Sequence, residues 1–305
     1  MKLRNFLWLL FLAALWGPSF LFIKVAVEQI PPLTLAMSRV GVAGILLYLI
    51  LRAQGRNLPP LGRVWLHFAF AGLVQNAIPF VLFGWGEQYI DSALAAILNG
   101  STPLFTLLLA HFFTSDDRLT PTKAIGTLIG FTGLSVLIGP SLLDGVKATA
   151  WGLIAVALAS TCYGVAIVYG RHYLRGLPPM VAPTAQMLLA TLFLIPVSLG
   201  LEQPFRLPVP SWPAIGSLLA LGIFGTGVAF IVYYRIMERT SATYVSMVTY
   251  LVPVFGVILG VVVLGETLSW NAYLGCALIL LGVMIVNGVV RAISWQRPTD
   301  VAVRP

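Results

Sequence analysis

The chain has 305 residues, of which 59% are hydrophobic and only 9% are charged, with a formal net charge of +8. A soluble domain usually has about a quarter of its residues charged, so the composition excludes a soluble enzyme, a secreted disulfide scaffold and a disordered chain. The basic residues stand singly or in pairs between apolar runs, which indicates membrane topology rather than a nucleic-acid partner. The composition therefore predicts a polytopic membrane protein.

The apolar runs have the length that an α-helix needs to cross a bilayer, which is roughly twenty residues. Ten such runs follow one another, at residues 6–27, 33–51, 65–83, 92–112, 121–138, 151–169, 181–199, 213–234, 242–264 and 270–287. None alternates like a membrane β-strand, so the predicted fold is an all-α integral membrane protein with ten transmembrane helices. The first run has no small-residue cleavage site after it, and we expect it to be retained rather than removed as a signal peptide.

The lysines and arginines between the runs predict the orientation, because cytoplasmic loops carry the excess of both residue types. With the N-terminus in the cytoplasm, only Lys24, Lys147 and Arg206 fall on the opposite side. The cytoplasmic side then collects Lys2, Arg4, Arg52, Arg56, Arg63, Arg118, Lys123, Arg171, Arg175, Arg235, Arg239, Arg291, Arg297 and Arg304. Both termini are predicted to be cytoplasmic.

A shift of about 150 residues aligns the two halves of the chain. The matched pairs include Gly17 with Gly164, Gly72 with Gly222, Phe80 with Phe230, and Pro103 with Pro253. We therefore expect one repeat at 1–140, a second at 141–290, and a cytoplasmic tail at 291–305. Five spans per repeat is an odd number, so the second repeat enters the membrane inverted, and such repeats around a central cavity are typical of alternating-access carriers.

Three sequence features resemble a known family. They are Trp16-Gly17-x-Ser19-Phe20, Pro32 with Arg39, and Leu264-Gly265-Glu266-x-Leu268. Together with glycines along spans five and ten, they resemble the EamA family of the drug/metabolite transporter superfamily, over essentially the whole chain. The resemblance implies a bacterial inner-membrane carrier, often an exporter of amino acids, and within the family it is greatest to YddG-type aromatic amino-acid exporters. Ser115-Asp116-Asp117 replaces Leu264-Gly265-Glu266 in the first half, so a symmetric role for that motif is not implied.

The first and sixth spans carry aromatic candidates for substrate binding. Trp16, Ser19 and Phe20 share one helical face, and Tyr163 stands where the second repeat matches Trp16. Paired aromatic rings near the axis shared by the repeats would sandwich a flat or apolar substrate. Helix packing is the alternative reading of these residues.

The third and eighth spans carry a mixed polar and aromatic face. Asn76, Pro79, Phe80 and Phe83 share a face, and Thr226 and Tyr233 lie on the corresponding face of the eighth span. An asparagine in hydrocarbon is costly unless it is bonded, so Asn76 must face protein or water. Asn76 therefore contacts either a substrate or a neighbouring helix. Pro79 leaves one backbone carbonyl without its helical hydrogen bond, and this carbonyl either binds substrate or only accompanies a kink in the helix.

The fourth and ninth spans are both interrupted by glycine or proline near their middle. Asn99, Ser101 and Thr102 surround Gly100 in the fourth span, and Thr249 and Tyr250 precede Pro253 in the ninth. Such paired interruptions in two inverted halves point to a binding site at the membrane midplane. Their amide and hydroxyl groups would hold the carboxylate or ammonium group of an amino acid.

Charged groups inside the spans are few. Arg39 lies about seven residues into the second span and has the neutral repeat mate Gln186, so it either attracts a substrate carboxylate, braces a gate, or bonds structurally to carbonyls. Lys24 is a second candidate for gating or charge, expected to extend to the surface. The acidic residues, including Glu87 and Glu266, fall at span ends, which counts against proton-coupled efflux of cationic drugs.

Glycines at 126, 130 and 133 in the fifth span, and at 275 and 282 in the tenth, let helices approach closely. We expect these two spans to pack on each other, with a homodimer face as the alternative. Cys162 and Cys276 lie in apolar runs without metal-ligand spacing, so no disulfide, metal site or cofactor is predicted.

The predicted function is alternating-access export of aromatic or apolar amino acids, or related small metabolites, down their gradient. The expected partners are this small-molecule substrate and the lipid bilayer. A nucleotide-sugar exchanger or a proton-coupled drug exporter is the alternative within transport, although the former would want several midplane lysines or arginines. A membrane-embedded enzyme would need a nucleophile with a base, or a metal cluster, at depth, and no such motif appears in the spans.

Overall fold

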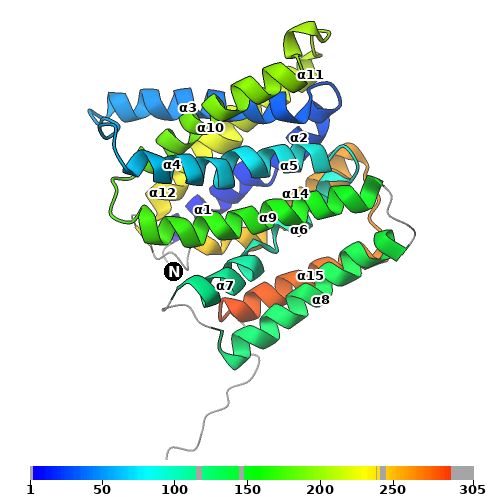
Figure 1. Cartoon of the computed structure of the whole chain (residues 1–305). Helices are drawn as coiled ribbons and strands as arrows, with labels where there is room; N and C mark the ends of the chain where they lie inside the picture. Colours follow the sequence, from blue (N-terminus) through cyan, green and yellow to red (C-terminus); the bar gives the residue numbers. More distant parts are fainter. Residues whose placement is uncertain (1–2, 115–118, 144–147, 238, 241–244, 290–305) are drawn as a thin grey trace, which may run out of the picture.

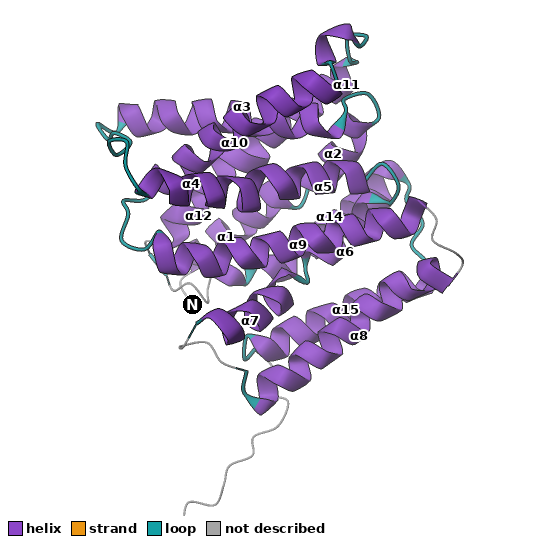
Figure 2. Cartoon of the chain, viewed as in Figure 1, coloured by secondary structure: helices purple, strands orange, loops and turns teal. Residues whose placement is uncertain are grey.

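The computed structural model describes residues 3–114, 119–143, 148–237, 239–240 and 245–289, and within these ranges the chain forms helices and connections without a strand (Figure 2). The helices are α1 (Leu3–Trp16), α2 (Ser19–Val27), α3 (Pro32–Ala53), α4 (Val64–Gly72), η1 (Leu73–Ala77), α5 (Ile78–Gly86), α6 (Ser92–Asn99), α7 (Thr102–Phe113), α8 (Pro121–Leu143), α9 (Ala148–Tyr173), α10 (Val181–Leu201), η2 (Pro204–Arg206), α11 (Trp212–Gly222), η3 (Ile223–Val228), α12 (Ala229–Met237), α14 (Val248–Leu264) and α15 (Trp270–Val286). The all-α prediction is confirmed.

Eight helices or continuous helical runs in the described ranges are long and apolar enough to cross a membrane. The remaining two apolar runs correspond to the shorter helices α14 and α15, each with 17 residues. The first residues of the predicted ninth span, 242–244, and the predicted tail, 291–305, lie outside the described residues. The apolar runs of the sequence therefore locate the helices well.

Several spans are built from two helices because the sequence interrupts them. The first span changes from α1 to α2 at Gly17-Pro18, and the fourth changes from α6 to α7 at Gly100-Ser101. The third and eighth spans contain the π-helical segments η1 and η3 between two α-helices. These interruptions place irregular backbone inside the membrane-spanning part, where backbone and side-chain groups are available for other contacts.

Each prominent helix pair joins a helix of the first half with one of the second. Helix α3 lies against α10, α6 against α14, α2 against α11, and α9 packs between α5 and α7, as Figure 1 shows. Helices α8 and α15 form a further pair at one edge of the bundle (Figure 1). The two halves of the sequence therefore interleave, and neither forms a core by itself.

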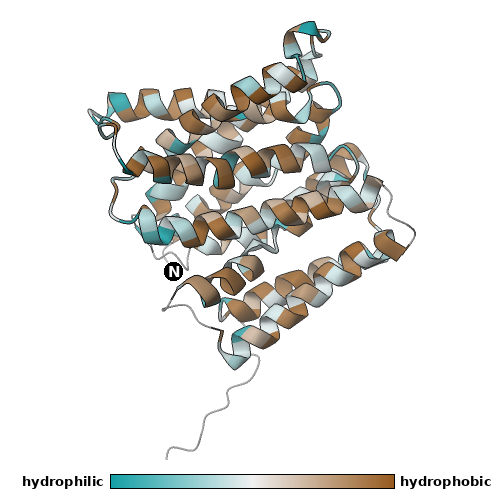
Figure 3. Cartoon of the chain, in the orientation of Figure 1, coloured by the Kyte–Doolittle hydropathy of each residue, from teal (hydrophilic) through white to brown (hydrophobic). Residues whose placement is uncertain are grey.

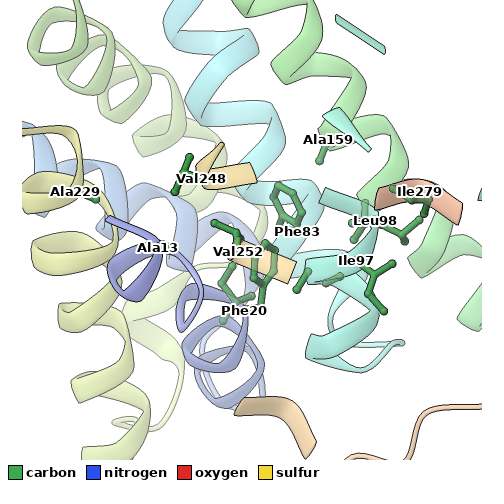
Figure 4. Close-up of a cluster of buried hydrophobic side chains, with 14 of the residues drawn as sticks. Ala13, Phe20, Phe83, Ile97, Leu98, Ala159, Ala229, Val248, Val252 and Ile279 are labelled. Atoms are coloured by element: carbon green, nitrogen blue, oxygen red, sulfur yellow. The ribbon is translucent and has the colours of Figure 1, made fainter. Parts of the chain in front are cut away.

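Buried side chains form two apolar clusters, and Tyr163 packs against both. The larger cluster includes Phe20, Phe83 and Val252, which gather from α2, α5 and α14 in Figure 4. Large apolar side chains such as Leu66 and Leu192 remain exposed, and apolar residues run along the helices (Figure 3). An apolar exterior of this kind suits a lipid environment.

The glycines of α8 and α15 meet at the contact between these helices. A Cβ atom added at Gly282 would lie 2.5 Å from the carbonyl oxygen of Gly126, and one added at Gly133 would lie 2.8 Å from that of Gly275. Only glycine permits this close approach of two backbones. The predicted packing of spans five and ten on each other is confirmed, and a homodimer through these helices stays a prediction.

We expect Gly282→Ala to lower the free energy of unfolding by about 1–3 kcal/mol, because its methyl group overlaps the backbone of α8. Thermal unfolding of the detergent-purified protein measures the change. Gly139→Ala is the matched control, since no atom lies within 4 Å of its added Cβ. Equal melting temperatures for the two variants would contradict the close contact.

Candidate functional site

Arg39 in α3 is buried, with 7% of its surface exposed. Its Nε donates a hydrogen bond of 2.9 Å to Oγ1 of Thr226. Its Cζ lies 3.8 Å from the centroid of the Phe80 ring, a cation–π contact. Three predicted site residues are thus brought together by α3, η3 and α5.

The two helices that contact Arg39 both contain a π-helical segment. The backbone N–H of Ile78 donates to the carbonyl of Leu73 at the end of η1, and that of Ala229 donates to the carbonyl of Phe224 at the end of η3. The segments begin 150 residues apart, at 73 and 223. Pro79 has no backbone N–H to donate, and its ring clashes with a carbonyl of the preceding helical turn. Both effects favour the wider turn of η1. Segments of this kind are frequent at functional sites.

Asn76 in η1 is 1% exposed, and neither its Oδ1 nor its Nδ2 has a hydrogen-bond partner among the described residues. The Oγ of Ser19 is likewise buried without a partner there. A Cβ added at Gly225 would lie 2.8 Å from this oxygen, which places Ser19 against η3. A buried polar group without a partner costs about 1–3 kcal/mol, so both side chains are candidates for contact with a ligand.

Aromatic rings continue from the Arg39 contact into the larger apolar cluster. The ring of Phe83 lies 5.6 Å from that of Phe20 and 5.9 Å from that of Tyr163. Tyr163 is also near enough to Arg39 to interact with it electrostatically. The structure therefore brings Phe20 and Tyr163 together through Phe83, beside the guanidinium group.

Trp16 forms a separate aromatic contact at the end of α1. Its ring lies 5.8 Å from that of Tyr233, at an interplanar angle of 40°. Tyr233 belongs to α12, directly after η3. Trp16 therefore packs against the eighth span, whereas Phe20 faces the third.

We define the Arg39 site as Arg39, Thr226, Phe80, Phe83, Phe20 and Tyr163. It joins a cationic group to an apolar, aromatic wall, with the unpaired Asn76 in the adjoining η1. A cation beside flat apolar surfaces is suited to a small molecule with both a carboxylate and an apolar group.

The polar residues of the fourth and ninth spans form local hydrogen bonds. Ser101 Oγ donates to the carbonyl of Leu98 at 2.5 Å, Thr102 Oγ1 to that of Asn99 at 2.8 Å, and Thr249 Oγ1 to that of Ser246 at 2.7 Å. These contacts stabilise the turns where the helices are interrupted. A Cβ added at Gly100 would lie 2.9 Å from Pro253 Cγ, so the two spans touch at their interruptions.

Tyr250 and Gln186 also make structural contacts. The hydroxyl of Tyr250 donates to the carbonyl of Val283 at 3.3 Å and accepts from Nδ2 of Asn287 at 2.7 Å, which ties α14 to the end of α15. Gln186 is 5% exposed, and its backbone lies against Gly72 at the end of α4. Neither contact includes the Arg39 site. Sequence reasoning missed Ser160, whose Oγ donates to the carbonyl of Leu98.

Lys24, expected to extend to the surface, is partly buried in the structure. Its Nζ donates to the backbone carbonyls of Glu87 at 2.8 Å and Ile90 at 2.7 Å. Both acceptors belong to the connection between α5 and α6. Lys24 therefore fastens α2 to this connection at the end of the third span.

Glu87 lies directly after α5, at the span end where the sequence places it, and its side chain is fully buried. Neither carboxyl oxygen has a hydrogen-bond partner among the described residues. Burial raises the pKa of Glu87 well above its ordinary range, the charge of Lys24 opposes this shift, and Glu266 reinforces it.

Two other glutamates cap helices of the first half. Oε1 and Oε2 of Glu266 accept hydrogen bonds from the backbone N–H groups of Ser92 and Ala93, at 2.8 and 3.0 Å. Glu202 accepts from the backbone N–H groups of Leu33 and Thr34, at 2.8 and 2.6 Å. The first N–H groups of a helix have no partner within it, so these carboxylates stabilise the starts of α6 and α3.

A surface hollow at the start of α1 is lined by Arg4, Leu7, Trp8 and Phe11. It includes none of the residues predicted to bind substrate. The expected central cavity stays a prediction.

The model of the EamA-like transporter family matches residues 3–139 and, a second time, residues 150–288. The chain belongs to this family. The family resemblance in the sequence is thereby confirmed, whereas a YddG-type specificity is not tested by the match.

Relatives of this EamA-family chain are named as transporters. The uncharacterized inner membrane transporter YedA of Escherichia coli is 31% identical over 277 residues, which cover 90% of this chain and 87% of YedA. An uncharacterized transporter of Archaeoglobus fulgidus is 28% identical and covers 89% of this chain and 94% of its own length. A probable terminal-alkyne amino-acid exporter of Streptantibioticus cattleyicolor is 26% identical, with coverages of 94% and 95%.

A solved crystal structure with 23% sequence identity has a similar fold, with a TM-score of 0.65 over 95% of this chain and 98% of the other. The likeness supports the fold alone. Together with the family, the apolar helices identify a membrane transporter and not an enzyme.

We expect Asn76→Leu to raise the free energy of unfolding by about 1 kcal/mol, because it removes two unpaired buried polar atoms at similar size. Thr226→Val is the contrasting variant and lowers stability by about 1–3 kcal/mol, since it leaves Nε of Arg39 unpaired. Thermal unfolding in detergent measures both. A destabilised Asn76→Leu protein would show that the amide has a structural partner.

Proposed function

We propose that this EamA-family protein exports amino acids with aromatic or other apolar side chains by alternating access. The observation that carries the proposal is the Arg39 site, where a buried guanidinium group adjoins an aromatic wall. An amino acid of this class presents a carboxylate to the cation and a flat or branched apolar group to the rings.

Arg39 is positioned to bind the carboxylate. Within the described residues, the side chain of Arg39 makes one hydrogen bond, from Nε to Thr226. The two terminal amino groups of the guanidinium therefore remain for a substrate. A guanidinium group binds a carboxylate with two parallel hydrogen bonds. Thr226 and Phe80 hold the plane of the group while this happens.

The aromatic residues provide the binding surface for the side chain. Phe20, Phe83 and Tyr163 come from α2, α5 and α9, so their rings separate whenever these helices move relative to one another. Trp16 and Tyr233 offer a second pair nearby in the first and eighth spans. Asn76 and Ser19 supply polar groups without protein partners, which suit the ammonium group of the same substrate.

Two inverted five-helix repeats would provide the alternating access. The same family model matches the chain twice, at 3–139 and 150–288, and the two π-helical segments begin 150 residues apart. These observations support an internal repeat. With five spans in each half, the second repeat lies inverted, so that two related packings open to opposite sides.

The relatives support the substrate class and the location. One of them is named a probable terminal-alkyne amino-acid exporter, and another an inner membrane transporter. We place this chain in the inner membrane of a bacterium, with both termini in the cytoplasm, and propose that the substrate moves down its own gradient.

In liposomes, we expect Arg39→Gln to lower phenylalanine uptake about ten- to a hundredfold, because it removes a charge-assisted contact that contributes about 1.5–3 kcal/mol. Phenylalaninamide, which lacks the carboxylate, should be a poor substrate for the wild-type protein and no worse for the variant. Arg52→Gln on the same helix is the control, since Arg52 is exposed. Phenylalanine uptake by Arg39→Gln at the wild-type rate would contradict the carboxylate role.

The orientation is tested by fusions to the C-terminus. A fluorescent protein that matures only in the cytoplasm should be bright, whereas alkaline phosphatase, which is active only outside it, should be inactive in the same position. The reverse pattern would overturn the proposed topology.

A further inference from the structure

The carboxyl group of Glu87 stands out among the acidic residues because it is fully buried and has no hydrogen-bond partner in the described part of the chain. Its surroundings explain the burial. Gly86 packs directly on Gly152 and Val156 of α9, and the preceding turn lies against Val27 and Pro32. An ionised carboxylate without partners is very costly in such a place.

The charged neighbours of Glu87 are engaged elsewhere. Lys24 of α2 uses its ammonium group on the carbonyls of Glu87 and Ile90. Glu266 uses both carboxylate oxygens on the start of α6. Arg39 of α3, which also acts on Glu87 electrostatically, donates to Thr226. Asp91 lies in the same connection and is half-buried.

We propose that Glu87 is a proton-binding site, and that its ionisation moves Lys24 from the two backbone carbonyls onto the Glu87 carboxylate. In the proposed protonated form, Lys24 keeps the two contacts seen in the structure, which fasten α2 to the connection 87–91. When the proton leaves to water, the ammonium group of Lys24 neutralises the new carboxylate. The two carbonyls then lose their donor, and the connection is released from α2.

The pKa of Glu87 fits this arrangement, because burial raises it well above its ordinary range and the Lys24 charge opposes the rise. A bistable contact of this kind is a pH-dependent switch on one end of the bundle. The connection 87–91 also leads directly into α6, whose first turn is held by Glu266. Proton release would therefore alter how α2, α5 and α6 are held together at this end.

Infrared spectroscopy of the purified protein tests the site without any transport assay. At neutral pH the wild-type spectrum should contain the C=O band of a protonated carboxyl group, which shifts in D₂O and disappears at high pH. The band should be lost in Glu87→Gln and retained in Glu28→Gln, which removes an exposed carboxylate. In Lys24→Met the band should persist to higher pH, because the opposing charge is gone.

Two results would overturn the proposal. The first is a wild-type spectrum at neutral pH with no band that Glu87→Gln removes. The second is a band that appears only in Lys24→Met, because Glu87 would then be ionised and paired with Lys24 in the native protein. The Lys24→Met protein and the wild-type titration keep the test decisive even if Glu87→Gln does not fold.

A second readout rests on the proposed export function. With equal pH on both sides of the liposomes, amino-acid transport should change with pH in the wild type and in Glu28→Gln, and lose that dependence in Glu87→Gln. If the protein transports no amino acid, the infrared result still stands, so the two proposals fail separately. A pH dependence that is the same in all three proteins would refute the switch.

Discussion

The guanidinium group of Arg39 lies inside an apolar helix bundle, and its need for polar or aromatic contacts constrains the helices next to it. Moving a charge away from water is expensive unless contacts replace its hydration. Arg39 has such contacts in the hydroxyl of Thr226 and the ring of Phe80, on two different spans. Both spans contain a π-helical segment next to the contact. Arg39 therefore links α3 to α5 and η3, and we propose that the same cation binds the carboxylate of the substrate.

Around this centre, the two halves of the sequence hold each other together. The helices pair across the halves, and Glu202 and Glu266 from the second half cap α3 and α6 of the first. Close backbone contact joins α8 to α15 through glycines. Movement in such a bundle has to occur between helices rather than between separate domains. The aromatic rings of the Arg39 site, which come from three helices, are placed where such movement changes their contacts.

The sequence predicts the helices well because the bilayer fixes the length of an apolar run, and it predicts the contact of spans five and ten because glycine marks close packing. It also singles out Arg39 as a charge inside a span. The π-helical segments escape prediction, since one extra residue in a turn barely changes the apolar pattern. The hydroxyl groups of Ser101 and Thr249 look available in the sequence, but they donate to carbonyls of their own turns. The burial of Glu87 follows from the packing of the residues before it on α9 and α2, which no local pattern reveals.

The central claim is that the Arg39 site binds the substrate. A structure of the protein determined with bound phenylalanine tests it most directly. We predict the carboxylate on the terminal amino groups of Arg39, the phenyl ring against Phe20, Phe83 and Tyr163, and the hydrogen bond from Nε to Thr226 preserved. Phenylalanine bound elsewhere, with the contacts of Arg39 unchanged, would contradict the claim and leave Arg39 a purely structural link between two spans.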